Sequence, residues 1–221
     1  MKQDVRVLIA KRAAMELQKD WVVNLGTGIP ALVADFIDES KNIYFQAENG
    51  FLGVGAASPP DKIDPYMVNA ASICCEIVPG GSFFDSAASF MMIRGGRLNA
   101  TILGSMQVSQ TGDFANWTLP GKDMLGMGGA LDLACGNIKP VIITMQHVSA
   151  KGEAKILAEC TIPLTGRGVV DTLITEFAVF YFRNGRMFLE EINPEVSLEE
   201  LKRMTPAEYE VSRELKSMEV K

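Results

Sequence analysis

Trp21-Val22-Val23-Asn24-Leu25 is an apolar run that predicts a buried strand, and Gly26-Thr27-Gly28 follows it without a break. Pro30 suits the first turn of a helix, which we place over residues 30–38. The next apolar run, residues 43–46, predicts a second strand. This order of strand, glycine turn, helix and strand is typical of α/β proteins. We therefore predict an α/β fold of three layers (αβα) with a mainly parallel central sheet.

The flanking sequence adds further helices and strands to this unit. Apolar residues recur at helical spacing near the N-terminus, and Gly95-Gly96 suit a helix C-cap. An Asn184-Gly185 turn separates two strand-like runs, and Ser197 with Glu200 forms a capping-box start. The expected helices are 4–19, 86–93, 130–136 and two short ones that begin at Ser197 and at Thr205-Pro206, and the expected strands are 99–106, 141–145, 173–182 and 187–192.

Size and composition limit the class of protein. With 221 residues and 48% hydrophobic residues, the chain can bury a large core, and it contains no linker-like or repetitive segment, so we predict one domain over residues 1–221. The formal net charge is −6 with both signs interspersed, which argues against a nucleic-acid surface and an anionic-membrane surface. No run approaches the roughly 20 apolar residues that span a bilayer, and residues 1–6 lack the apolar core of a signal peptide. We therefore expect a cytoplasmic protein.

Cysteine and histidine usage argues against a metal centre. Cys74 and Cys75 are adjacent, Cys135 and Cys160 lie far apart in apolar surroundings, and His147 is the only histidine. A zinc site needs about four ligands, and the chain has no Cys-x-x-Cys pair. We expect buried reduced thiols, no metal site, and a polar strand-end role for His147.

A carboxylate stands at the end of the second strand, in the run Gln46-Ala47-Glu48-Asn49-Gly50. Asn-Gly is a strong hairpin signal, because both residues accept the positive φ angles that tight turns need. Glu48 is therefore either a solvated turn residue or a carboxylate presented at an edge, where it can act as a nucleophile or a base. The local pattern alone favours the hairpin turn.

Two glycine-rich stretches accompany this carboxylate. Gly26-Thr27-Gly28 lies between a strand and a helix, where α/β folds bind ligands, but Pro30 and Ala31 interrupt a full dinucleotide fingerprint, so tight turn packing is the simpler interpretation. Gly126-Met127-Gly128-Gly129 precedes a helix and exposes backbone N–H groups, which suit an oxyanion that develops during acyl transfer. A flexible connector is an equal alternative for this second stretch.

Glu48-Asn49-Gly50-Phe51-Leu52-Gly53 resembles the Ser-Glu-Asn-Gly signature of the family I CoA-transferases, in their β-subunit half. Other segments are similar to the same family in the same order, and together they span residues 5–192. They are residues 23–30, Phe84-Asp85-Ser86, Met92-Ile93-Arg94-Gly95-Gly96, Leu103-Gly104, Gly112-Asp113, Ala115-Asn116-Trp117, Pro120-Gly121-Lys122, 126–133 and 160–166.

The resemblance implies a covalent transfer reaction. In this family a glutamate attacks an acyl-CoA thioester, carries CoA as a glutamyl-CoA thioester and passes it to a second carboxylic acid, in a ping-pong reaction without a metal or an organic cofactor. The nucleophile corresponds to Glu48, and the backbone oxyanion donors correspond to Gly128 and Gly129. Contacts to substrate or CoA are expected from Asn49, Gly50, Gly26, Gly28 and Lys122.

The resemblance also implies a substrate class and a partner. The chain is most similar to the β subunits that act on acetate, butyrate and acetoacetate, in short-chain fatty acid and ketone-body metabolism. An α subunit of the same family would complete the active site, commonly as an α2β2 heterotetramer. An acyl-CoA thioester hydrolase on the same scaffold and a non-catalytic ligand-binding subunit are the alternatives.

Three positions depart from the family pattern. Ala47 replaces the usual Ser, Arg97 replaces the usual His after Gly95-Gly96, and Ser72 stands where some relatives carry a lysine that contacts CoA. We expect a small effect at Ala47, a change of acyl specificity if Arg97 faces the acyl pocket, and CoA phosphates that depend on other groups than residue 72.

Overall fold

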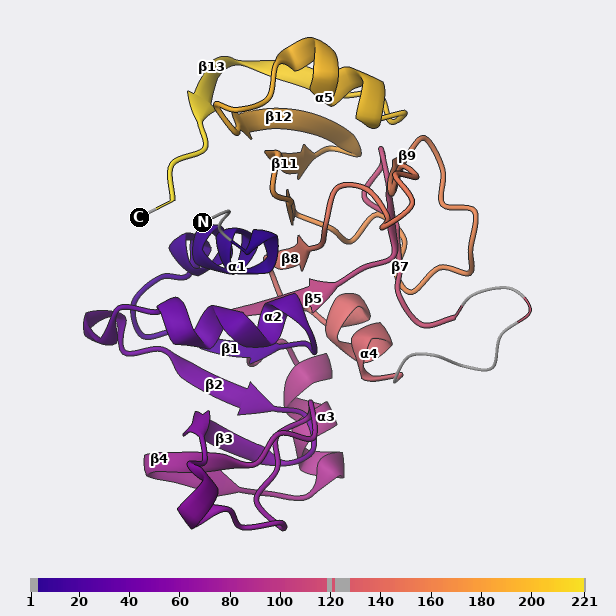
Figure 1. The fold of residues 1–221 in the computed structure, drawn as a ribbon. Coiled ribbons are helices and arrows are strands. Elements are labelled where there is room, and N and C mark those ends of the chain that lie inside the picture. The colour runs from indigo at the N-terminus through magenta and orange to yellow at the C-terminus, as the bar shows by residue number, and fades with distance from the viewer. Residues whose placement is uncertain (1–3, 119–120, 122–127, 221) are drawn as a thin grey trace.

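A computed structural model describes residues 4–118, 121 and 128–220 and contains a ten-stranded sheet (Figure 1). Its centre consists of parallel strands in the order β10-β8-β5-β1-β2. Their bounds are Val22–Leu25 for β1, Tyr44–Ala47 for β2, Ala100–Gly104 for β5, Val141–Thr144 for β8 and Thr172–Ile174 for β10. The predicted α/β fold with a mainly parallel central sheet is confirmed.

Further strands extend the sheet at both edges. Beyond β2 lie β3 (Phe51–Ala57) and β4 (Cys75–Phe83), both antiparallel to their neighbours, with a 3-10 turn, η3 (Pro60–Lys62), in the connection between them. Beyond β10 lie β11 (Ala178–Arg183), β12 (Arg186–Ile192) and β13 (Glu210–Ser217), of which β13 runs parallel to β12. In Figure 1 these two groups of strands occupy opposite ends of the molecule. A separate three-stranded sheet consists of β6 (Gln107–Ser109), β7 (Phe114–Ala115) and β9 (Ile156–Leu157).

Helices cover both faces of the central strands. α1 (Val5–Glu16) and α2 (Ile29–Leu32) pack on one face, and α3 (Ser86–Arg94) and α4 (Gly129–Cys135) pack on the other (Figure 1). Side chains alternate between the two faces along a strand. Ile102 of β5 therefore joins the core under α1, whereas Leu103 joins the core under α3 and α4. The predicted three layers are present.

Helix boundaries follow the capping residues. Asp4 accepts a hydrogen bond from Arg6 N at the start of α1, and Asp85 accepts one from Ala88 N at the start of α3. The helix predicted over residues 30–38 is wrong in its second half. After α2 the chain forms a 3-10 turn, η1 (Val33–Phe36), and then a second one, η2 (Glu39–Lys41). Asp38 caps η2 from an extended conformation, so it cannot continue the helix before it.

Two predictions for the C-terminal third need correction. The strand predicted over 173–182 is two strands, because the Thr175 hydroxyl accepts hydrogen bonds from Phe177 N and Ala178 N in a turn between β10 and β11. α5 (Leu198–Met204) begins at the predicted capping box. No further helix follows in the described residues 205–220: Thr205 Oγ1 donates to Leu201 O at the end of α5, and the chain then enters β13.

The cysteines and the histidine differ in their surroundings. Cys75 is buried, but Cys135 at the end of α4 is exposed, contrary to the prediction of four buried thiols. His147 is buried shortly after β8, with Nδ1 3.0 Å from Thr175 Oγ1 and Nε2 2.9 Å from Thr205 Oγ1. Burial, with a smaller contribution from Lys155, lowers the pKa of His147 to about 4, so the ring is neutral at pH 7. None of the helices that the structure describes combines the length and the apolar character needed to cross a membrane.

Candidate active site

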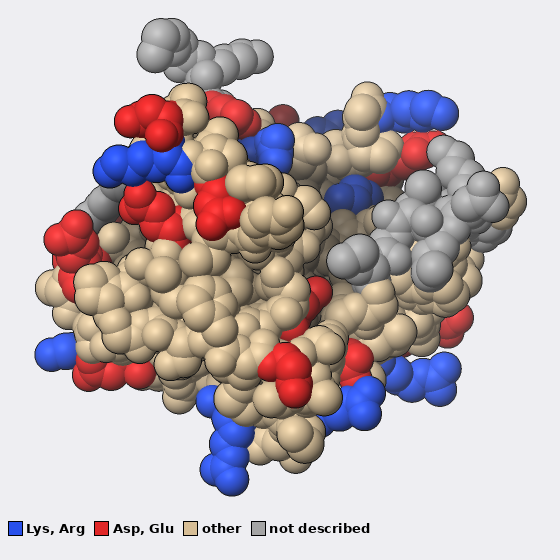
Figure 2. Space-filling model, turned by 90° about the horizontal axis from the view of Figure 1, so that it is seen from below, with Lys and Arg blue, Asp and Glu red and all other residues tan. Residues whose placement is uncertain are grey.

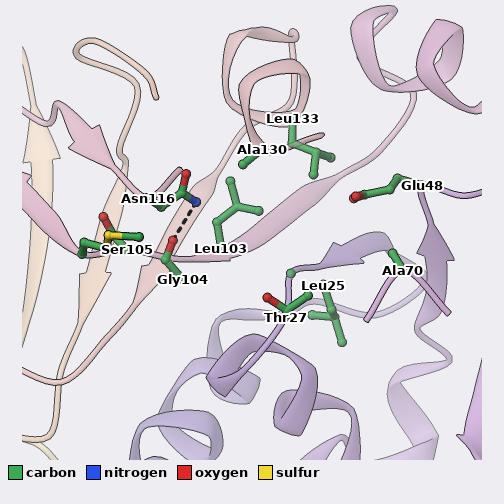
Figure 3. A pocket seen from close by; sticks show the side chains of 12 residues that line it. Leu25, Thr27, Glu48, Ala70, Leu103, Gly104, Ser105, Asn116, Ala130 and Leu133 are labelled. Atoms are coloured by element: carbon green, nitrogen blue, oxygen red, sulfur yellow. Dashed lines mark hydrogen bonds between the residues drawn. The ribbon is translucent and has the colours of Figure 1, made fainter. Parts of the chain in front are cut away.

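A cavity of about 280 Å³ lies at the carboxyl ends of β1 and β5 (Figure 3). These strands are neighbours in the sheet, but the chain leaves β1 through α2 towards β2 and enters β5 from α3 on the opposite face. Open α/β sheets form ligand crevices at such reversals of strand order. The cavity is lined by Leu25, Gly26, Thr27, Glu48, Ala70, Leu103, Gly104, Ser105, Met106, Asn116, Ala130 and Leu133.

Glu48 reaches this cavity from the turn between β2 and β3 (Figure 3). Ala47 pairs with Phe51 across the turn, so the predicted hairpin is confirmed. Gly50 has a φ of 131°, and its Cα lies so close to the Phe84 carbonyl oxygen that no side chain fits there. Phe84 N donates to Gly50 O at 2.9 Å, which ties the turn to the start of α3. Glu48 is therefore both a residue of the hairpin turn and a carboxylate presented at the edge of the sheet.

The carboxylate of Glu48 lies directly against Gly129, the first residue of α4. A Cβ atom at Gly129 would stand 2.6 Å from Glu48 Oε1 and 3.0 Å from Glu48 Cδ, which is closer than side chains approach one another. A Cβ atom at Gly128 would meet nothing within 4 Å. The structure thus brings two of the predicted site residues into contact, and position 129 requires a glycine as long as Glu48 occupies this place.

The surroundings of Glu48 disfavour its charged form. Burial raises the pKa of Glu48, and the negative charge of Asp132 on α4 raises it further. Arg94 of α3 pairs with Asp132, since its Nε donates a hydrogen bond of 2.6 Å to Asp132 Oδ1. Within the described part of the chain, no group donates a hydrogen bond to the Glu48 carboxylate. Glu48 lines the cavity, so its carboxylate can meet a ligand there.

The glycine turn after β1 contributes less than the motif suggests. Gly26 lines the cavity, and Gly28 does not. Gly26 N donates to Ile102 O at 2.8 Å, and a Cβ atom at Gly26 would stand 3.2 Å from the same oxygen, so close packing on β5 explains this glycine. Gly28 precedes α2 with a φ of 81°. Lys122 and Gly126, the other predicted residues of the glycine-rich loop, lie outside the described residues.

Asn49 supports the cavity wall without lining it. Its side chain is exposed, and Nδ2 donates to Val68 O at 2.8 Å. Val68 belongs to the connection between β3 and β4, which brings Ala70 to the wall of the cavity. In this structure Asn49 Nδ2 is engaged within the chain, and the predicted contact of Asn49 with a ligand stays a prediction.

The three departures from the family pattern lie away from the carboxylate. Ala47 is buried against Phe51 and Cys75, and strand alternation directs it to the face opposite Glu48. Arg97 and Ser72 are exposed, and neither lines the cavity. The expected influence of Arg97 on the acyl pocket therefore has no basis in the geometry of this chain.

Two polar residues of the wall, Ser105 and Asn116, were not predicted as site residues. Asn116 Nδ2 donates to Gly104 O at 2.9 Å (Figure 3). Thr165 Oγ1 donates to Asn116 Oδ1 at 2.7 Å. Ser105 directly follows β5, so its place at the carboxyl edge of the sheet could have been inferred from the strand end. Asn116 follows a strand of the small separate sheet, and no local pattern directs it to the cavity.

The arrangement supports nucleophilic or base chemistry by one carboxylate. Among residues 4–118, 121 and 128–220, no three His, Cys, Asp or Glu residues are grouped so that they could hold a metal ion. The cavity offers a half-buried carboxylate, apolar side chains from β1, β5 and α4, and a glycine beside the carboxylate. Such a site can form and protect a covalent intermediate on Glu48.

Comparisons with known proteins bear on the class of protein to which the chain belongs. The sequence model of the family described as coenzyme A transferase matches residues 6–203. The chain is 51% identical over 207 residues to a subunit of the succinyl-CoA:3-ketoacid coenzyme A transferase of Helicobacter pylori, covering 94% of this chain and 99% of the relative. It is 46% identical over 212 residues to the beta subunit of the acetate CoA-transferase of Escherichia coli, covering 96% of each. Among solved structures, acyl-CoA transferase YdiF of Escherichia coli O157:H7 has a TM-score of 0.79 at 25% identity, over 98% of this chain and 43% of that chain.

Proposed function

Because the chain belongs to the coenzyme A transferase family, we propose that it is the β subunit of an enzyme that moves CoA between a short-chain acyl-CoA and a carboxylic acid through a glutamyl-CoA thioester on Glu48. The observation that carries this proposal is the contact between the Glu48 carboxylate and Gly129 inside the cavity. The match over nearly the whole chain to subunits of succinyl-CoA:3-ketoacid and acetate CoA-transferases supports the class of substrate.

The proposed reaction has two halves, and each half consists of two steps. An oxygen of ionised Glu48 attacks the thioester carbonyl carbon, the C–S bond breaks, and CoA leaves as a thiolate from a mixed anhydride. The thiolate then attacks the Glu48 carbonyl carbon, so the donor acid leaves as a carboxylate and Glu48 carries CoA as a thioester. An incoming carboxylate reverses both steps and leaves as its CoA ester. This sequence consumes no proton and requires no metal or organic cofactor.

The surroundings of Glu48 suit a nucleophile. A carboxylate with a raised pKa is more nucleophilic in its ionised form, and its partial burial has already removed water that an attack would displace. Leu25, Leu103 and Leu133 line the same cavity. Their apolar side chains limit the water that would otherwise hydrolyse the anhydride and the thioester.

We assign the stabilisation of the oxyanion to backbone N–H groups of Gly128 and Gly129. Gly129 is the first residue of α4 and Gly128 is its N-cap, so neither N–H group has an acceptor one turn earlier in the helix. An oxyanion that forms on the acyl carbon beside Glu48 develops next to Gly129, given the contact between these residues. A single donor of this kind contributes about 10²–10³-fold to kcat in other acyl-transfer enzymes.

Gly129→Ala is expected to lower kcat by roughly 10²-fold, because its methyl group would occupy the position of the Glu48 carboxylate and displace it. Gly128→Ala is the matched comparison. It adds the same methyl group at a φ of −69° with nothing within 4 Å, and it keeps the N–H group, so we expect a loss of at most about threefold. Steady-state CoA transfer measures both variants, and equal rates for the two would contradict the contact between Glu48 and Gly129.

An α subunit of the same family completes the proposed active site, in an α2β2 assembly. The relatives that match nearly their full length are named as subunits, and this chain spans only 43% of the YdiF chain. The β3–β4 end of the molecule also carries exposed aromatic side chains, with Tyr66 95% exposed and Phe83 exposed as well. Figure 2 views the molecule from this end and shows a broad area with few charged side chains. Exposed apolar areas of this kind commonly mark interfaces.

The size of the cavity supports a short acyl group. A volume of about 280 Å³ falls just below the usual range of small-molecule sites. The part of the cavity that this chain forms accommodates groups of the size of acetyl, butyryl and acetoacetyl. We therefore propose acetate, butyrate and acetoacetate as the acids to be tested first.

Acetoacetyl-CoA formation from acetyl-CoA and acetoacetate tests the proposal in four arms, with and without the α chain and with and without the acceptor acid. We expect transfer only when both are present. Thioester loss at the same rate without an acceptor would identify a hydrolase instead. Full activity of the isolated chain would exclude the need for an α subunit. If none of these acids and CoA esters turns over in any arm, the result would favour a non-catalytic subunit.

A further inference from the structure

We propose that Gln46 is a positioning residue, whose buried side chain is held between Asn24 and Ser89 and thereby fixes the direction in which the β2–β3 turn presents the Glu48 carboxylate. The inference rests on the proposed function of Glu48, because it concerns the geometry of the same nucleophile. It adds a residue that lies outside the cavity and acts on the reaction only through the backbone of the turn.

The orientation of Glu48 depends on this backbone. Within the described ranges, its carboxylate accepts no hydrogen bond from the protein that would hold it in place. Gly129 limits its position by contact alone. The turn at residues 46–50 carries the side chain, so anything that loosens the end of β2 also spreads the positions of the carboxylate.

A chain of buried hydrogen bonds holds the end of β2. Gln46 is 3% exposed, and its Nε2 donates to Ser89 Oγ of α3 at 2.7 Å. Asn24 of β1 donates twice from Nδ2, to Gln46 Oε1 at 2.8 Å and to Gln46 O at 3.1 Å. Asn24 and Ser89 are both fully buried. One side chain thus joins the ends of two neighbouring strands to a helix on one face of the sheet.

These hydrogen bonds join the ends of β1 and β2, and both strand ends lead into the cavity. Asn24 lies directly before Leu25, Gly26 and Thr27, which line one side. Gln46 lies two residues before Glu48, and strand alternation puts Gln46 and Glu48 on the same face. Asn24 and Gln46 are direct neighbours in the parallel register of β1 and β2. The hydrogen bonds therefore fix the nucleophile relative to the opposite wall.

Packing alone does not explain polar residues at these positions. Asn24 Oδ1 and the neighbouring Thr101 Oγ1 are buried without a hydrogen-bond partner among the described residues, and Asn24 pairs with Thr101 in the β1–β5 register. Unsatisfied buried polar atoms destabilise a fold, and apolar residues of similar volume often stabilise it more. The hydrogen bonds among Asn24, Gln46 and Ser89 are therefore better explained by the geometry that they give the end of β2 than by a gain in stability.

The test uses Gln46→Met, Ser89→Ala and the double variant, each assembled with the α chain. Gln46→Met keeps the length of the side chain and removes its amide, and Ser89→Ala removes one oxygen atom. We expect Gln46→Met to lower kcat about 10–100-fold with KM changed less than about threefold, and Ser89→Ala to lower kcat by a smaller factor. The double variant should be no slower than Gln46→Met, because both changes break the same hydrogen bond.

Asn99→Ala is the control. Asn99 Oδ1 accepts a hydrogen bond of 2.8 Å from Val22 N at the opposite end of β1, so its loss affects stability without touching the turn. We expect this variant to keep the wild-type kcat. Hydrogen exchange of the Gly50 N–H group, which donates to Ala47 O at 3.1 Å, supplies a readout without catalysis: it should become faster in Gln46→Met and stay unchanged in Asn99→Ala.

The outcomes separate this inference from the proposed function. A wild-type kcat and unchanged Gly50 exchange in Gln46→Met and Ser89→Ala would overturn the positioning role while CoA transfer by the wild type still stands. A wild-type complex that transfers no CoA would overturn the proposed function, and the exchange measurement would then still decide whether Gln46 holds the turn. If Gln46→Met does not fold, Ser89→Ala decides on both readouts.

Discussion

Replacing Glu48 with Gln is expected to lower CoA transfer by at least roughly 10⁴-fold, because an amide can neither attack the thioester nor carry CoA. The substitution keeps the size of the side chain and breaks no hydrogen bond of the described residues. Steady-state rates of the variant and the wild type, each assembled with the α chain, measure the effect. Glu199→Gln, which changes an exposed carboxylate on α5, should keep the wild-type rate. A Glu48→Gln rate within tenfold of the wild type would remove Glu48 from the mechanism.

The same variant should be more stable than the wild type at neutral pH. The pKa of Glu48 in the folded chain is raised above its ordinary value of 4.5, so folding favours the protonated form. Below pH 4.5 both the folded and the unfolded state are protonated, and as pH rises through the raised pKa the ionised carboxylate destabilises the fold. Gln stays neutral throughout. The gain in the thermal midpoint of Glu48→Gln should therefore grow with pH above 4.5, and a gain that is independent of pH would contradict the raised pKa.

Arg12→Ala is expected to lower the free energy of unfolding by roughly 3–5 kcal/mol, because it leaves two partly buried carboxylates without their counter-charge. Arg12 of α1 is 4% exposed, and Nε and Nη2 each donate to Glu191 of β12 at 2.8 Å. Its Nη1 lies 2.8 Å from Glu16 Oε1, and Tyr181 donates a hydrogen bond of 2.7 Å to the same oxygen. Burial alone would lower the pKa of Arg12, but the contacts with Glu191 and Glu16 outweigh it and raise the pKa.

Urea unfolding at pH 7 measures this loss against two comparisons. Arg183→Ala breaks a pair of the same 2.8 Å length with Glu190, but Arg183 is 59% exposed, so we expect a loss of at most about 1 kcal/mol. The triple variant Arg12→Met, Glu16→Gln, Glu191→Gln removes all three charges and should recover most of the stability. A similar loss in Arg12→Ala and Arg183→Ala would show that burial does not govern this ion pair.

The central sheet could be predicted from local sequence because its strands are buried on both faces and read as continuous apolar runs. β8 and β5 are examples, and both were predicted within a few residues. β13 could not be found in this way. Half of its residues, 210–217, are charged and most are exposed, and the strand exists because it pairs with β12 at the edge of the sheet. The turn at Thr175 depends on a side-chain hydroxyl that bonds to the backbone, which interrupts an otherwise apolar run.

The candidate site could be predicted only in part. Glu48 was found because the turn signal and the family resemblance both fall on Glu48-Asn49-Gly50. Its contact with Gly129 joins residues from different layers of the fold, so no local pattern could supply the distance between them. Gln46 is visible as a polar residue in an apolar strand, but its partners Asn24 and Ser89 are 22 and 43 residues away in the sequence. Lys122 lies outside the described residues and stays a prediction.

The most direct test of Glu48 as the carrier of CoA is the intact mass of the chain after the α–β complex has been incubated with an acyl-CoA in the absence of an acceptor acid. We expect the chain to gain the mass of one CoA less one water, the gain to map to the peptide with Glu48, and Glu48→Gln to show none. A wild-type chain without any adduct, together with undiminished CoA transfer by Glu48→Gln, would contradict this role.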